Sequence, residues 1–186
     1  MRVARLAVAL NIVSALLLPL AAGADDDLRL VVGKNDGSHA AAQLPLTDAQ
    51  LVHAKSVWAW TTQLPPRKID RPIAQQREAI VAELRRLPAR PLQVRLRGWS
   101  RPDELASLRV IAAPAEMWAS VPEPLLPTFP VSKEGRVTIN IRDPARIRVV
   151  GEKFGTAWEQ VSGTTRTIEI ELRQPAADAT PTFRLS

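Results

Sequence analysis

The chain contains no cysteine and no tyrosine, and it has only two histidines in 186 residues. The absence of cysteine excludes disulfides, cysteine nucleophiles and thiolate metal sites. The two histidines, His39 and His53, lie 14 positions apart, which is not a metal-ligand spacing. We therefore expect no metal and no other cofactor, and we expect packing and backbone pairing to stabilise the fold.

Long apolar runs are missing as well, except at the amino terminus. Two arginines in the first five residues precede an apolar run over residues 6–22, and an acidic cluster follows it. This order is typical of a secretory signal peptide over residues 1–24, cut between Ala24 and Asp25 after an Ala-x-Ala site. The alternative is a retained membrane anchor, because the run has about the minimum length that spans a bilayer.

Export and composition together indicate where the protein acts and what it binds. Removal of residues 1–24 takes away two arginines, so 162 residues remain and the net charge falls from +6 to +4. A cysteine-free exported chain suits the bacterial periplasm, with at most a peripheral contact to the outer membrane. Its basic residues are mostly arginine, which suits carboxylates and phosphates. We expect anionic polysaccharide or envelope proteins as partners, and no nucleic acid.

Two helices are predicted in the first half of the chain. Thr47 and Gln50 form a capping-box pattern, and apolar residues at helical spacing then predict a helix over residues 48–58. The stretch "IDRPIAQQREAIVAELRRLP" predicts a second helix, with Asp70 as its cap and an apolar stripe that ends near Leu87. The prolines of "QLPPRK" separate the two helices, which predicts a helical hairpin.

Alternating apolar and polar residues predict short strands over much of the remaining chain. The expected strands are 28–32, 93–97, 108–113, 136–142, 146–150 and 167–173. The fold class is therefore α+β, with small mixed or antiparallel β units and the helical hairpin as an insertion. The expected divisions after residues 1–24 are an α+β unit at 25–113, a proline-rich connection at 114–130, a β-rich unit at 131–174 and a disordered tail at 175–186.

Apolar and polar residues alternate in the strand-turn-strand stretch "RVTINIRDPARIRVVGE", and after the turn arginine occupies alternate positions. Glutamates alternate in the later strand "TIEIELR", so neighbouring strands would place Glu169 or Glu171 across from this arginine row. Such pairs contribute about 0.2–1 kcal/mol each. The favoured interpretation is a paired, solvated face, and the alternative is a ligand-binding surface. The candidate contact residues in this row are Arg142, Arg146 and Arg148.

A second candidate site surrounds one of the five tryptophans. In "RLRGWSR", an indole is flanked by guanidinium groups, a combination that suits an acidic sugar or a headgroup. The alternative is a tryptophan of the hydrophobic core. The candidate contact residues in this stretch are Arg95, Arg97, Trp99 and Arg101.

The stretch "SVWAWTTQLPPRKIDRPIAQQREAIVAELRRL", and "AQQREAIVAELRRL" within it (74–87), resembles the bacterial capsule-biosynthesis GfcC-like family. The stretch "RIRVVGE" (146–152) is similar to the strand-then-glycine entry into a β-grasp unit of polysaccharide-export proteins. The resemblance covers about half of the chain without its leader. It implies that the small β units are β-grasp-like. It also implies a non-enzymatic accessory role in the biosynthesis and export of capsule or exopolysaccharide, through binding of envelope components.

Two other functions stay open at this point. One is a structural or assembly module of a surface appendage or secretion system, whose edge strands pair with partner strands. The other is an envelope glycan hydrolase, which needs two carboxylates about 5–10 Å apart in one cleft. The acids available for such a pair are Asp70, Asp103, Glu104 and Glu116. Each of them also suits a helix cap or a first helical turn.

Overall fold

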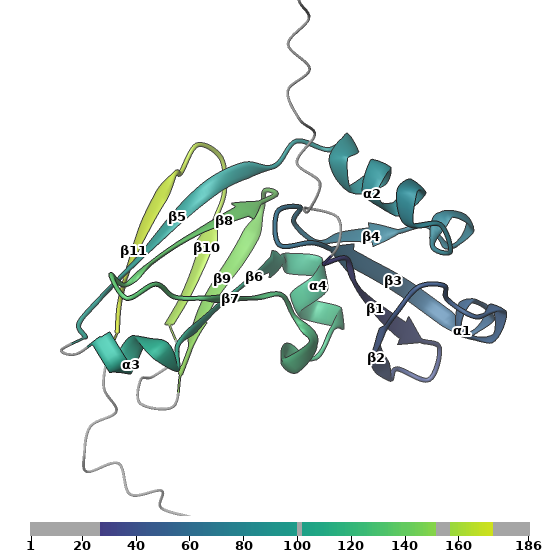
Figure 1. The fold of residues 1–186 in the computed structure, drawn as a ribbon, viewed down its shortest axis with the longest axis horizontal. Coiled ribbons are helices and arrows are strands. Elements are labelled where there is room, and N and C mark those ends of the chain that lie inside the picture. Colours follow the sequence, from purple (N-terminus) through teal and green to yellow (C-terminus); the bar gives the residue numbers. More distant parts are fainter. Residues whose placement is uncertain (1–26, 100–101, 152–156, 173–186) are drawn as a thin grey trace, which may run out of the picture.

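The computed structural model describes residues 27–99, 102–151 and 157–172 (Figure 1). Over these residues the protein is a strand-rich α+β fold with three small sheets and few short helices, which confirms the predicted class. The predicted cleavage site at Ala24 and Asp25, and the tail at 175–186, lie outside the described residues. No helix of the described part is long and apolar enough to cross a membrane.

The first sheet is antiparallel and has the strand order β2-β1-β3-β4. Its strands are β1 (Arg29–Lys34), β2 (His39–Ala42), β3 (Ala54–Trp60) and β4 (Arg67–Ile69). The turn between β1 and β2 closes through a hydrogen bond from the Lys34 N–H to the Ser38 carbonyl at 2.8 Å. The two central strands, β1 and β3, are buried on both faces of the sheet.

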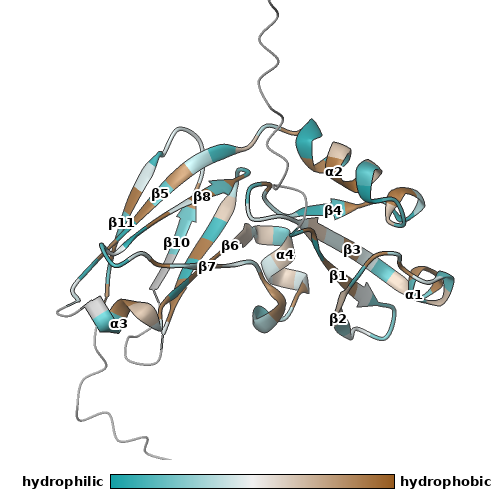
Figure 2. Ribbon diagram, viewed as in Figure 1, coloured by the Kyte–Doolittle hydropathy of each residue, from teal (hydrophilic) through white to brown (hydrophobic). Residues whose placement is uncertain are grey.

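Short helices cover one face of the first sheet. They are α1 (Asp48–Val52), the 3-10 turn η1 (Arg71–Ile73) and α2 (Arg77–Arg86). Ile80 and Leu84 of α2 pack against the sheet. Figure 2 shows that hydrophobic and hydrophilic residues are interspersed along this helix.

The other two sheets face each other as a sandwich. The three-stranded sheet has the order β11-β5-β8, in which β11 is parallel to β5. Alternate residues of β5, such as Leu92 and Val94, are buried against the opposite sheet. The strands of this sheet are β5 (Arg90–Arg97), β8 (Arg136–Ile141) and β11 (Thr167–Glu171).

The four-stranded sheet of the sandwich has the order β10-β9-β6-β7 and is antiparallel. Its strands are β6 (Arg109–Pro114), β7 (Thr128–Pro130), β9 (Ala145–Val150) and β10 (Ala157–Val161). The helix α3 (Pro102–Ala106) closes one end of the sandwich through the buried Leu105.

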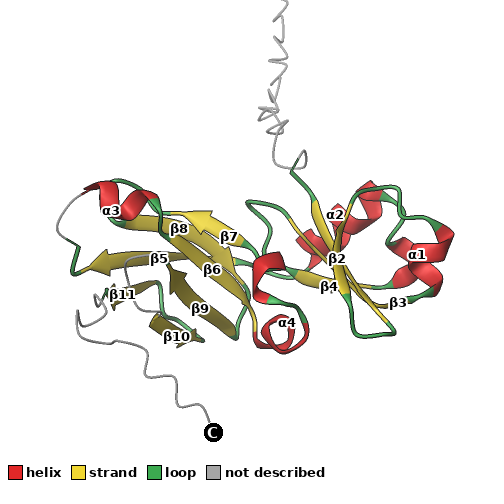
Figure 3. Cartoon of the chain, turned by 90° about the horizontal axis from the view of Figure 1, so that it is seen from below, coloured by secondary structure: helices red, strands yellow, loops and turns green. Residues whose placement is uncertain are grey.

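The strand β6 joins the sandwich to the first sheet. Val110 and Ala112 face the sandwich core, whereas Ile111 and Ala113 belong to a second core with Trp58 of the first sheet. The helix α4 (Ala115–Ser120) and the 3-10 turn η2 (Glu123–Leu125) line this second core, and Figure 3 shows α4 between the two parts.

The predicted helix over residues 48–58 is wrong in its second half. The capping box at Thr47 and Gln50 is present, with Gln50 N–H donating to Thr47 Oγ1 at 3.2 Å, but α1 ends at Val52. The chain then enters β3, because residues 57–60 are buried on both faces of a sheet. A run buried on both sides has no period that distinguishes a strand from a helix.

The predicted helical hairpin is also wrong, since β3 and β4 lie between α1 and α2. Asp70 precedes η1 and makes no side-chain cap, and α2 begins only at Arg77.

The predicted connection at 114–130 contains α4, η2 and β7. Strands on its two sides pair with each other, β5 with β8 and β6 with β9, so the connection does not separate two sheet units.

Gly135 allows Trp99 to lie against the turn before β8. Gly135 has φ +70°, and a Cβ there would lie 2.8 Å from Trp99 Nε1. Gly163 has φ +68° with no atom within 4 Å of an added Cβ, so it is a matched control.

We expect Gly163→Ala to lower the free energy of unfolding by about 1 kcal/mol, because alanine is strained at a positive φ and its Cβ meets no other atom there. Gly135→Ala should lower it by about 2–4 kcal/mol, because the indole must also move. Urea denaturation of both variants measures the difference, and equal losses would show that the indole contact contributes nothing.

Candidate functional site

The predicted site around Trp99 is mostly structural. Trp99 is half-buried against the sandwich core, and its Nε1 donates to the Leu96 carbonyl at 3.1 Å. Arg95 is half-buried and donates through Nε to Gln93 Oε1 at 2.9 Å. Arg101 lies outside the described residues. The packing of Trp99 against the core agrees with the core alternative considered from the sequence, and ligand binding by these residues stays a prediction.

Arg97 is exposed on β5 and pairs with Glu169 on the neighbouring β11, at 2.8 Å between Nη2 and Oε1. The hydrogen bond from Arg97 holds the pKa of the Glu169 carboxyl below its ordinary value. Glutamate thus lies across from arginine as the sequence indicated, but the arginine belongs to a different strand. The predicted partners are wrong, because Arg146 and Arg148 lie on β9 in the other sheet and Arg142 follows β8, which β5 separates from β11.

Arg142 connects the sandwich to the first sheet and its helix α2 through hydrogen bonds. Its Nη1 donates to the carbonyls of Pro65 and Pro66, and its Nη2 donates to the Leu84 carbonyl in the last turn of α2. The side chain is half-buried, and burial lowers the pKa of its guanidinium, with the positive charge of Arg67 as a smaller cause. Backbone carbonyls at a helix end lack partners within the helix, so this contact satisfies one of them.

The other two arginines of the row behave differently from each other. Arg148 forms an ion pair and hydrogen bond with Glu123, at the start of η2. Arg146 is exposed, and its main-chain carbonyl accepts a hydrogen bond from Trp118 Nε1 at 3.1 Å. The candidate arginines therefore do not form one surface, because they lie on different sheets and most contact the protein itself.

A site that the sequence reasoning missed lies at the edge of the first sheet. Among the described strands, β2 pairs only with β1, so its outer side is open. The strand reads His-Ala-Ala-Ala and carries none of the prolines or charges that protect sheet edges. A hollow opens on each face of the sheet beside it. We call β2 with these two hollows the edge site.

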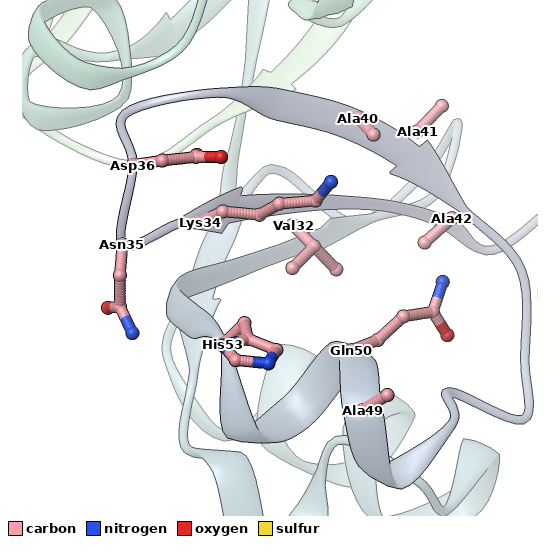
Figure 4. A pocket seen from close by; sticks show the side chains of 10 residues that line it. All are labelled: Val32, Lys34, Asn35, Asp36, Ala40, Ala41, Ala42, Ala49, Gln50 and His53. Carbon is pink, nitrogen blue, oxygen red and sulfur yellow. The ribbon is translucent and has the colours of Figure 1, made fainter.

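The first hollow, which we call the α1 hollow, has a volume of about 500 Å³. It lies between the sheet and α1, where Ala40 and Ala42 share the face of their partners Val32 and Leu30. The methyl groups of these alanines are too short to fill the space between the sheet and α1. Figure 4 shows Gln50 of α1, and His53 directly after this helix, across the hollow from the strands. The other lining residues are Lys34, Asn35, Asp36, Ala41 and Ala49.

The second hollow, which we call the η2 hollow, lies on the opposite face and has a volume of about 470 Å³. Val31 and its partner Ala41 form the sheet side together with Trp60, and Leu125 of η2 forms the other wall. Both hollows fall within the size range of protein binding sites. The other lining residues are Leu28, Arg29, Leu30, Ala42, Gln43, Pro124, Leu126 and Thr128.

The lining of the two hollows suits binding better than catalysis. Asp36 is the one carboxylate that lines either hollow, and its Oδ1 accepts hydrogen bonds from Ser38 N at 2.9 Å and Oγ at 2.7 Å. These bonds lower the pKa of Asp36, as expected for an acid that holds a turn. In the part of the chain that the structure describes, no three His, Cys, Asp or Glu residues could hold a metal.

Comparisons of the chain with known protein families, with curated proteins and with solved structures found no match.

The contacts of Arg142 predict a loss of stability when its donors are removed. We expect Arg142→Met to lower the free energy of unfolding by about 2 kcal/mol, because buried carbonyls lose their partner. Arg146→Met is the matched control, since that side chain is exposed, and it should change stability by less than about 0.5 kcal/mol. Urea denaturation measures both variants. A similarly small loss in the free energy of unfolding for Arg142→Met would contradict the role of Arg142 in connecting the sandwich to the first sheet.

Proposed function

We propose that this protein is a non-enzymatic binding protein of the bacterial cell envelope, which holds a partner protein at the edge site. The observation that supports this most is an open edge strand with an apolar hollow on each face. Main-chain groups at a sheet edge and apolar space beside them are what a polypeptide partner needs for binding.

The sequence resemblance supports a more specific proposal. Residues 74–87 and 146–152 resemble proteins of capsule biosynthesis and polysaccharide export. On this basis the partner is a component of a polysaccharide-export system, and the protein acts as an accessory to export in the periplasm. The β-grasp character of the sheet units belongs to the same proposal.

The geometry favours a protein partner over anionic polysaccharide. A polysaccharide site would need several arginines on one face, whereas Arg142 donates to backbone carbonyls and Arg97 and Arg148 pair with glutamates. The edge site, in contrast, offers apolar space and backbone hydrogen-bonding groups, which suit a polypeptide.

The open edge also favours a second function, an assembly module of a surface appendage or secretion system. The partner would then be a neighbouring subunit, and the two functions differ in whether surface polysaccharide depends on the protein. A glycan hydrolase has less support. Its four candidate acids line neither hollow, and Glu116 lies 3.5 Å from Lys68 Nζ.

A complementation experiment tests the export proposal. In the strain of origin, we expect deletion of the gene to lower surface polysaccharide several-fold and the wild-type gene to restore it. Ala41→Lys, which adds a charge to the edge, should not restore it, because edge lysines oppose strand pairing.

Ala106→Lys on α3 is the control and should complement as the wild type does, since Ala106 is exposed at the far end of the sandwich (Figure 1). Normal polysaccharide in the deletion strain would reject the export proposal. A loss of surface appendages in that strain would support the assembly function instead.

A further inference from the structure

We propose that the edge site takes an extended segment of a partner protein, which pairs with β2 as an added strand. Its successive side chains enter the α1 hollow and the η2 hollow alternately. This inference rests on the proposed binding function and specifies the mode of binding and the chemistry of the partner.

The main chain of β2 presents hydrogen-bonding groups to such a strand. The Lys34 N–H donates to the Ser38 carbonyl, so this pair is hydrogen-bonded. Hydrogen-bonded and open pairs alternate along antiparallel strands. Ala40 and Ala42 therefore direct their N–H and C=O groups to β1, while His39 and Ala41 direct theirs outward. These outward groups can form up to four hydrogen bonds with an added strand, which a lipid chain or a sugar cannot match in spacing.

The two hollows meet the same short stretch of β2. Ala41 and Ala42 line both of them, although the hollows lie on opposite faces of the sheet. Successive side chains of a strand point to opposite faces. Two adjacent residues of an added strand therefore reach the two hollows at once.

The size and charge of the site indicate what those residues are. A second copy of this chain would offer the alanines of its own β2, and methyl groups would not fill hollows of about 500 and 470 Å³. Large apolar side chains such as Leu or Phe suit them better. Lys34 and Arg29 are exposed at the two hollows, and the acid nearby, Asp36, is already bonded to Ser38. We therefore expect acidic residues next to the apolar pair.

Synthetic peptides can test this mode with the purified protein. The probe is an octapeptide with Leu-Phe at its centre and Thr and Glu on both sides, labelled for fluorescence anisotropy. We expect at least tenfold weaker binding when either central residue is alanine. Single N-methylation along the peptide should weaken binding at every second residue only, because alternate N–H groups face β2.

Substitutions on β2 test the same contact from the protein side. Ala42→Trp fills the α1 hollow and Ala41→Trp fills the η2 hollow, so each should weaken binding at least tenfold. Ala41→Pro removes an outward N–H, a change that edge strands tolerate. Ala106→Trp on α3 is the control and should bind as the wild type does. Thermal unfolding checks that each variant is folded.

Several outcomes would overturn the proposal. Absence of binding to every apolar-centred peptide would reject it, and N-methyl effects without the two-residue period would show a groove without strand pairing. A concentration-dependent dimer that Ala41→Pro abolishes would assign the edge to a second copy of the chain. Peptide binding with normal surface polysaccharide would reject the export role alone, whereas a polysaccharide defect without peptide binding would reject strand addition alone.

Discussion

The structure depends on the burial of β6 on both of its faces. Val110 and Ala112 pack into the sandwich, and Ile111 and Ala113 pack toward the tryptophans of the first sheet. One strand is therefore part of two cores, which fixes the first sheet against the sandwich. The η2 hollow follows from this arrangement, because its walls come from the first sheet and from the segment after β6. The edge site therefore depends on this joint, that is, on the packing of the first sheet against the sandwich, as well as on β2.

Arginines strengthen the same joint through backbone carbonyls rather than through ligands. Arg142 reaches carbonyls at 65, 66 and 84 across the joint. Within the first sheet and its helices, Arg67 of β4 donates to the Glu83 carbonyl of α2 at 2.9 Å. Within the sandwich, Arg90 binds both carboxylate oxygens of Asp143 and donates to the Thr165 carbonyl, so it holds two turns together. A planar group with several donors suits this use, and lysine could not replace it. Several arginines of the described part of the chain therefore have a structural role in internal contacts.

The sequence allowed local structure to be predicted where a single face is buried. Alternation in "RVTINI" identified β8, and the capping box at Thr47 identified the start of α1. The prediction of secondary structure failed at β3, because burial on both faces removes the alternating pattern. The prediction of a partner failed for Glu169, because the order of strands distant in the sequence decides which arginine lies beside it. The edge site was missed for a related reason. Alanine favours helices and is depleted in strands, so the letters "HAAA" do not predict a strand. Only the elements that surround β2 in the structure show that it is an edge strand with a hollow on each side.

The order of the strands along the chain has a consequence for how the protein forms during synthesis. The first sheet and its helices come from the continuous stretch 29–86, so their contacts are available once this stretch has emerged from the ribosome. The sandwich must wait for β11, which ends at Glu171 and pairs with the much earlier β5. Until β6 and α4 have been synthesised as well, Trp58 and Trp60 have no cover from these two elements. The nascent chain therefore carries an uncovered indole surface, the kind of surface that chaperones bind.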